Sequence, residues 1–299
     1  MIIDEQHRFG VHQRLALRNK GAQQNSYPHQ LIMTATPIPR TLAMTAYADL
    51  DTSIIDELPA GRLPVNTAVI PNMRRDEIIT RIRHVCQQGR QAYWVCPLID
   101  ESEKLQLQAA EDTAQYLTAL LPNLPIGLVH GRMKSKDKEA IMAQFKQGDI
   151  AVLVATTVIE VGVDVPNASL MIIENAERLG LAQLHQLRGR VGRGFQESFC
   201  VLLYQPPLSE IAKIRLAAIR ESHDGFVIAQ RDLEIRGPGE VLGTKQTGVM
   251  NLRVADLDRD KEFLSDIVSI ADELLMKHPA SCNALIKRWI RSSLSYGQV

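Results

Sequence analysis

Residues 150–166 read IAVLVATTVIEVGVDVP, and this stretch decides the fold class. Its first part, Ile150–Ala155, is a nearly continuous apolar run, which is typical of a strand buried on both faces of a parallel sheet. Polar residues begin at Thr156, where the strand is expected to end. In open parallel sheets, ligands bind beyond the carboxyl ends of the strands. The stretch therefore predicts a buried strand with functional residues directly after it.

The same alternation of short apolar strands and helical patterns runs outward from this stretch in both directions. Further strands are expected at Leu31–Met33, Thr67–Ile70, Ala92–Cys96, Ile126–Val129, Leu170–Ile173 and Phe199–Leu203. Helical spacing puts one apolar face of Arg74–Gln88 at Ile78, Ile79, Ile82, Val85 and Cys86. The helix expected at Lys134–Gln147 turns Ala140, Ile141 and Phe145 inward. The alternation predicts an α/β fold, with a parallel sheet and helices on both of its faces.

Two breaks in this pattern divide the chain. Asp56–Asn66, with Pro59, Gly61 and Pro64, breaks the pattern and is interpreted as a linker, with a long surface loop inside one domain as the alternative. After Pro206 no strand is expected, and helices follow from Ser209, with one face at Ile211, Ile214, Ala217 and Ala218. We expect a domain remnant over 1–58, a complete domain over 59–206, a helical hairpin over 207–250 and C-terminal helices over 251–299.

A second informative segment, residues 186–193, reads QLRGRVGR. It places Arg190 and Arg193 among glycines at the end of an expected helix. Arginine carries a permanent charge and a planar fork that matches phosphate oxygens. The glycines leave room for a large anion to approach. By itself, the segment is equally compatible with a solvated basic helix end.

Carboxylates and hydroxyls follow two other expected strands. Asp4 and Glu5 directly follow the apolar run Met1–Ile3. In such a pair, one carboxylate can assist Mg²⁺ binding and the other can activate water. Thr34 and Thr36 follow Leu31–Met33 and suit a relay between a phosphate site and a neighbouring domain. By themselves, the first pair is also typical of a solvated loop, and the second of an ordinary helix N-cap.

In this order along the chain, these motifs resemble the motor core of superfamily 2 helicases and translocases, in which two RecA-like domains hold ATP. The resemblance implies catalytic roles for Glu5, Arg190 and Arg193, with Glu5 orienting the attacking water and the two arginines acting as fingers on the phosphates. It implies that Asp4 assists Mg²⁺, that Thr34 and Thr36 couple hydrolysis to movement, and that Gly162, Asp164 and Gln186 contact the nucleotide.

The same resemblance implies a DNA-binding group. Thr156 would contact the nucleic-acid backbone, and His130-Gly131-Arg132 resembles a second backbone-contact motif. For His130 and Arg132, an ordinary strand-to-helix loop is the alternative. Tyr93 and Trp94 lie inside an apolar strand and are expected to be core residues rather than platforms for bases.

The amino-acid sequences of three longer segments restrict the resemblance to the RecG family of branched-DNA helicases and the related transcription-repair coupling factors. The segments are Asp4–Val11, Thr34–Leu42 and Asp224–Glu240, the last similar to a helical-hairpin translocation motif. There Arg236 is expected to act as a lever or DNA contact, with a purely structural helix and loop as the alternative. Gln6, Pro238 and residues 243–248 are closer to RecG.

This resemblance implies an ATP-dependent translocase on double-stranded DNA that remodels replication forks and Holliday junctions. The alternatives are the motor of a coupling factor and a non-catalytic DNA-binding fragment. No Gly-x-x-x-x-Gly-Lys-Ser/Thr loop, which holds the β- and γ-phosphates, occurs in the 299 residues. In the family this loop precedes the Asp-Glu motif. We therefore expect the chain to be part of a longer protein and to be inactive alone.

Composition indicates how the protein would bind DNA and in which compartment it would be found. The formal net charge is zero, so DNA binding is expected through local basic clusters rather than a general basic surface. The four cysteines lack metal-binding spacing, and Cys86 and Cys96 are expected to be core thiols in a reducing compartment. No apolar run is long enough to span a bilayer. We expect a cytoplasmic protein that is a monomer at full length and has branched DNA as its partner.

Overall fold

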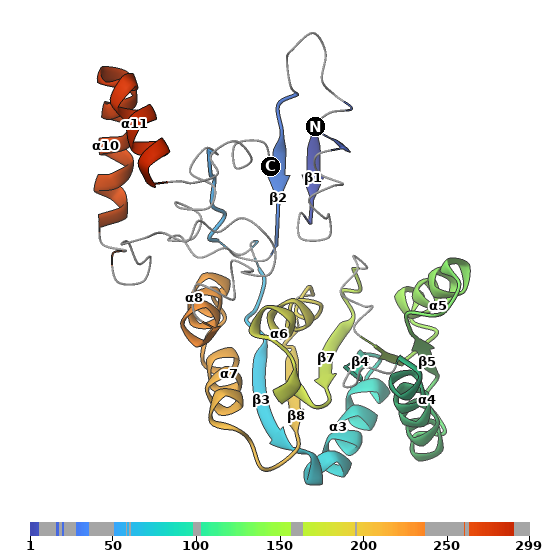
Figure 1. Ribbon diagram of the computed structural model, residues 1–299. Helices are drawn as coiled ribbons and strands as arrows, with labels where there is room; N and C mark the ends of the chain where they lie inside the picture. Colours follow the sequence, from blue (N-terminus) through green and yellow to red (C-terminus); the bar gives the residue numbers. More distant parts are fainter. Residues whose placement is uncertain are drawn as a thin grey trace. The chain divides into compact units, whose positions relative to one another are not determined.

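The computed structural model describes residues 1–5, 16–17, 20, 28–35, 51–57, 59, 61–97, 103–156, 164–194, 196–236, 260 and 263–289 (Figure 1). Contacts divide the chain into two compact units. Ile55–Asp232 form the larger unit, and Met1–Ile54 together with Leu233–Val299 form the smaller one. The domain boundaries expected from the sequence remain a prediction.

In the described part of the larger unit, six strands form one parallel sheet in the order β3-β8-β7-β4-β6-β5. The strands are β3 (Asn66–Pro71), β4 (Gln91–Val95), β5 (Ile126–Val129), β6 (Val152–Ala155), β7 (Ala168–Ile173) and β8 (Phe199–Tyr204). Every strand expected in this unit is present, and its ends differ from the expected ones by two residues or fewer. β6 is buried throughout, as its continuous apolar run predicts.

Helices α3 (Arg75–Gln87) and α4 (Glu103–Leu120) cover one face of this sheet. The buried residues of α3 are the five expected: Ile78, Ile79, Ile82, Val85 and Cys86. In one core cluster, residues of α3 pack with Leu117 of α4 and with Trp94, Val154 and Ile172 from three strands. Because side chains alternate along a strand, the intervening residues face the opposite side.

Helix α5 (Ser135–Gln147) covers that opposite face. The ring of Phe145 meets the ring of Tyr93 edge-on, with centroids 4.9 Å apart. Both Tyr93 and Trp94 are buried, so the expectation that they are core residues is confirmed. Ala140 is exposed, so its expected inward position is wrong, whereas Phe145 is fully buried. Helices on both faces of a parallel sheet confirm the predicted α/β fold.

Helices α6 (Leu181–Arg188), α7 (Glu210–Glu221) and α8 (Gly225–Arg236) follow later in the chain. Helix α7 contacts β3 and α6. Its buried face is Ala212, Leu216 and Ile219, whereas Ile211 is 55% and Ile214 is 52% exposed. The apolar face expected from Ile211 and Ile214 is therefore the wrong one, because β3 and α6 contact the neighbouring face of the helix.

In the smaller unit, β1 (Ile2–Asp4) pairs in parallel with β2 (Leu31–Met33), so the expected strand Leu31–Met33 is confirmed. Helices α10 (Leu264–Lys277) and α11 (Pro279–Trp289) contact each other. In the part of the chain that the structure describes, no helix combines the length and apolar character that a membrane crossing needs.

Candidate functional site

The carboxyl edge of the six-stranded sheet collects the predicted DNA-contact residues. His130 follows β5 and Thr156 follows β6, and these two strands are paired at Val129 and Ala155. The backbone N–H of Thr156 donates to the carbonyl of Val129 at 3.2 Å, so His130 and Thr156 follow neighbouring strand ends. Arg132 is exposed in the loop before α5, whereas Thr156 is only 3% exposed. The structure thus brings the three residues to one edge and leaves Arg132 the most accessible.

Helix α6 positions the arginine-glycine segment. Leu181, Leu184 and Leu187 are buried along one side of the helix, which ends at Arg188 with Gly189 as its C-cap. We call residues 189–194, directly after the helix, the finger loop. Gln186 is half-buried on the last turn of α6.

Arg188 anchors the end of α6 and is the only charged residue that is buried in the described part of the chain. Its Nη1 donates to the carbonyl oxygens of Ile219 at 2.6 Å and Ser222 at 2.8 Å, both at the C-terminal end of α7. A cation is favourable at a helix C-terminus, where carbonyls lack helical partners. Burial lowers the pKa of Arg188, but these acceptors match its charged form. Arg188 therefore holds α6 against α7 rather than facing a ligand.

Glycines let the finger loop pass between two other segments. Gly192 has φ +76°, and a Cβ there would lie 2.6 Å from Cγ2 of Val65. A Cβ on Gly194 would lie 2.6 Å from the carbonyl oxygen of Pro166. No side chain fits at either distance without a shift of its neighbours. The loop is therefore held between residues 62–65, before β3, and residues 164–166, before β7.

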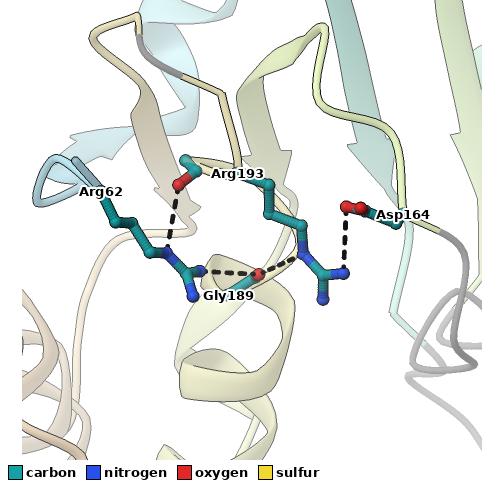
Figure 2. A network of polar contacts seen from close by, with 5 residues as sticks. Arg62, Asp164, Gly189 and Arg193 are labelled. Atoms are coloured by element: carbon teal, nitrogen blue, oxygen red, sulfur yellow. Dashed lines mark hydrogen bonds and ion pairs between the residues drawn. The ribbon is translucent and has the colours of Figure 1, made fainter. Parts of the chain in front are cut away.

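Two arginines share an acceptor in this loop (Figure 2). Arg193 donates through Nε to the carbonyl of Gly189 at 3.2 Å and pairs through Nη1 with Oδ1 of Asp164 at 3.2 Å. Arg62 donates through Nε to the carbonyl of Gly192 at 3.1 Å and through Nη2 to that of Gly189 at 3.4 Å. The structure thus brings together Arg193 and Asp164, which the sequence placed in one site, and adds Arg62, which it did not.

Positive charge gathers at this point of the sheet edge. Burial raises the pKa of Tyr93 to about 12, while Arg190 and Arg193 lower it and Asp164 raises it further. The charges of Arg190 and Arg193 therefore both act on Tyr93, in the middle of β4. Burial lowers the pKa of Arg62, and the charge of Arg193 lowers it further, with Asp164 acting in the opposite sense. The guanidiniums of Arg62 and Arg193 lie near the Asp164 carboxylate, and this excess of positive charge suits an anion such as a phosphate.

A second polar cluster at the carboxyl edge was not expected. Arg75 Nη2 lies 2.7 Å from Oε1 of Glu174, the residue after β7. The guanidinium of Arg75 also lies 5.0 Å from the ring centroid of Trp94 and 5.3 Å from that of Tyr116. Burial raises the pKa of Glu174, and the charge of Arg75 opposes this rise. The cluster joins α3, α4, β4 and β7 and acts as a structural tie.

In the smaller unit, Asp4 and Glu5 follow β1 and Thr34 follows β2. Asp4 is paired with Met33, so Glu5 and Thr34 directly follow the ends of two neighbouring strands. The N–H of Glu5 donates to Oδ1 of Asp4 at 2.9 Å, and Glu5 has the unusual φ of +53°. Among the described residues, no three His, Cys, Asp or Glu side chains gather as a metal cage. One exposed carboxylate such as Asp4 fits Mg²⁺ held mainly by water and phosphate oxygens.

Three predicted residues are not placed in a site. Thr36 and Gly162 lie outside the described residues. Arg236 ends α8, and its side chain is also outside what the structure describes. Sequence reasoning missed Arg62 because it lies in the segment interpreted as a linker. Arg188 stands in the same arginine-glycine segment as Arg190, and only its burial distinguishes the two.

Two family models match the chain. Residues 75–194 match the helicase conserved C-terminal domain, and residues 222–290 match ATP-dependent DNA helicase RecG, domain 3, C-terminal. The chain is 66% identical over 297 residues to ATP-dependent DNA helicase RecG of Escherichia coli (strain K12), which covers 99% of the chain and 43% of that protein. It is 64% identical over 300 residues to the protein of the same name from Pasteurella multocida (strain Pm70), with 100% and 43% covered.

A solved structure of RecG bound to a three-way DNA junction is also similar. Its TM-score is 0.67 at 43% sequence identity, and the match covers 88% of this chain and 33% of that chain. The chain thus spans 43% of the length of these two curated relatives.

Proposed function

The chain belongs to the RecG family, and from this premise we propose that it forms part of an ATP-driven motor on double-stranded DNA that remodels replication forks and Holliday junctions. The observation that carries the proposal is the finger loop. It carries two arginines three residues apart, Arg190 and Arg193, at the carboxyl edge of a parallel sheet, where such folds bind ligands.

In this proposal, hydrolysis of the phosphate anhydride of ATP supplies the free energy for movement. Arg190 and Arg193 face the phosphates and neutralise the charge that develops on them during transfer. Gln186 faces the same phosphates from the end of α6. Asp164, with Gly162, approaches the sugar. The guanidinium donors and the local excess of positive charge fit this ligand.

The proposal also assigns roles to residues of the smaller unit. Asp4 assists Mg²⁺, and Glu5 orients and deprotonates the attacking water. The φ of +53° at Glu5 supports this assignment, because strained backbone is found more often at functional sites. Thr34 and Thr36 couple hydrolysis to movement.

We assign DNA contact to the strand ends that carry His130, Arg132 and Thr156. Exposed Arg132 supports this assignment, since backbone phosphates are contacted mainly by arginine and lysine. Arg236 couples the motor to DNA as a lever or as a direct contact. The proposed partner is branched double-stranded DNA, and the similar solved RecG structure is bound to a three-way DNA junction.

The RecG domain 3 match over residues 222–290 favours RecG over a transcription-repair coupling factor. We also propose the domain division 1–58, 59–206, 207–250 and 251–299, a location in the cytoplasm and a monomeric full-length protein. Light scattering of the full-length protein tests the last of these.

The proposal is tested in a full-length chimera that joins the preceding part of the E. coli relative to this chain. We expect it to hydrolyse ATP when DNA is added and to unwind a synthetic fork and a Holliday junction. A folded chimera that binds the fork but neither hydrolyses ATP nor unwinds it, beside an active E. coli protein, would overturn the proposal.

A further inference from the structure

The segment before β3 carries an arginine that the proposed reaction does not use. Arg62 follows Gly61, which has φ +82°, and the N–H of Arg62 donates to the carbonyl of Pro59 at 3.1 Å. This turn directs the Arg62 side chain at the finger loop, 130 residues away along the chain. Figure 2 shows its guanidinium beside that of Arg193.

The guanidinium of Arg62 donates to both Gly189 and Gly192. These two carbonyls flank Arg190 and Val191, so one planar fork spans the part of the loop that carries the first finger. Lysine offers a single ammonium on a flexible stem and cannot reproduce a fork that spans two acceptors. The contact therefore depends on arginine itself and not only on positive charge.

The Gly189 carbonyl links Arg62 to the second finger. It accepts from Arg62 and from Nε of Arg193, which occupies both of its lone pairs. As the C-cap of α6, Gly189 is at a helix end, where carbonyls attract cations. Arg62 thus shares an acceptor with the residue proposed to face the phosphate.

Packing fixes the same neighbourhood. The segment of Arg62 continues into Val65, which is buried and fills the space where a side chain on Gly192 would lie. Asn66 then enters β3 and donates to the carbonyl of Ser198 at 2.9 Å. The loop is therefore supported by residues 62–65, and the Asn66 hydrogen bond fixes this segment at the start of β3.

We propose that Arg62 is a positioning residue that holds the finger loop so that Arg190 and Arg193 face the nucleotide. Arg62 lies seven positions after Ile55, the first residue of the larger unit, so it also ties the loop to the segment that enters this unit. The inference rests on the proposed function for its catalytic half, because it requires the arginines to face phosphate. Its structural half, an ordered loop held by Arg62, stands independently.

The structural half is tested by hydrogen exchange on the 299-residue chain. In Arg62→Lys and Arg62→Gln, amides of residues 189–194 should exchange at least about tenfold faster, with the melting temperature nearly unchanged. Arg90→Lys is the matched control, because Arg90 donates to one carbonyl, that of Glu197, outside the finger loop. Unchanged exchange in the loop overturns the inference, whatever the activity.

The catalytic half is tested in the full-length chimera. Arg62→Lys should lower kcat at least about tenfold, with the KM for ATP and the affinity for fork DNA nearly unchanged. A lower melting temperature together with loss of DNA affinity would indicate general destabilisation and overturn a positioning role. Faster amide exchange in the finger loop with an unchanged kcat would also overturn it. Failure of the proposed function is recognised separately, because Arg193→Lys would then retain full activity while Arg62 is intact.

Discussion

Arg193 and Asp164 form an ion pair, with Nη1 and Oδ1 3.2 Å apart, that joins the finger loop to the segment before β7. The side chains are 31% and 59% exposed, and exposed pairs contribute only about 0–1 kcal/mol to stability. The pair therefore matters for the direction of Arg193 more than for folding.

Asp164→Asn separates a role of the Asp164 carboxylate in folding stability from a role in ATP binding. We expect the free energy of unfolding to change by less than about 1 kcal/mol. In the full-length chimera, the KM for ATP should rise about tenfold, since one charge-assisted hydrogen bond to the sugar is weakened. Denaturant unfolding and steady-state ATPase kinetics measure both. A large fall in kcat with unchanged KM would instead show that Asp164 acts through Arg193 alone.

Replacing either finger by lysine keeps the charge and removes the fork. Arg190→Lys or Arg193→Lys in the full-length chimera should leave the melting temperature unchanged and lower the ATPase rate, by about 10³-fold for a full finger. Arg178→Lys is the control, because Arg178 is an exposed arginine outside the finger loop. A folded Arg193→Lys variant with normal turnover would contradict the finger role.

The 299-residue chain by itself should hydrolyse ATP negligibly, because its sequence lacks the phosphate-binding loop despite Glu5 and both arginines. A phosphate-release assay with and without fork DNA measures this, and the full-length chimera serves as the positive control. Turnover of about 1 s⁻¹ or faster, as in ordinary enzymes, would contradict the prediction.

Arg236 ends α8, after every nucleotide motif, and its replacement should separate movement from hydrolysis. In the full-length chimera, Arg236→Ala should keep DNA-stimulated ATP hydrolysis and lose most fork unwinding. The reason is the loss of a charged contact to DNA or to the element that transmits movement. Melting temperature, ATPase rate and unwinding are measured on one preparation. An equal loss of both activities with a lower melting temperature would favour a purely structural role.

His185 makes stability depend on pH. Burial, followed by the charge of Arg188, lowers its pKa to about 4 in the folded chain, against 6.5 ordinarily. Between these values the unfolded chain binds a proton that the folded chain does not, so stability is complete above pH 6.5 and falls as the pH drops to 4. The contribution is up to about 3 kcal/mol.

Chemical denaturation of the 299-residue chain from pH 7 to pH 4 measures this slope. His185→Gln should flatten it, whereas His84→Gln, at an exposed position on α3, should not. An identical slope in His185→Gln and the unaltered chain would assign the pH dependence to other groups.

Local patterns predicted the sheet and one helix well. The buried face of α3 follows from the spacing of five residues within one helix, and β6 from one continuous apolar run. The face of α7 was predicted wrongly, because Ile211 and Leu216 are equally apolar and only the contacts with β3 and α6 select between them. The positions of the sequence motifs after the strands predicted which residues gather at the sheet edge, but not how these residues contact one another.

The sequence by itself determined the strand order along the chain, the family and the identity of Arg190 and Arg193 as candidate fingers. These are properties of neighbouring residues, since side-chain periodicity and motif spacing are local. Only the tertiary structure decided that Arg188 is buried against α7 and that Arg62 donates hydrogen bonds to the finger loop. The physical reason is that both contacts join residues far apart in the chain, and every arginine looks alike until folding decides which carbonyls it reaches.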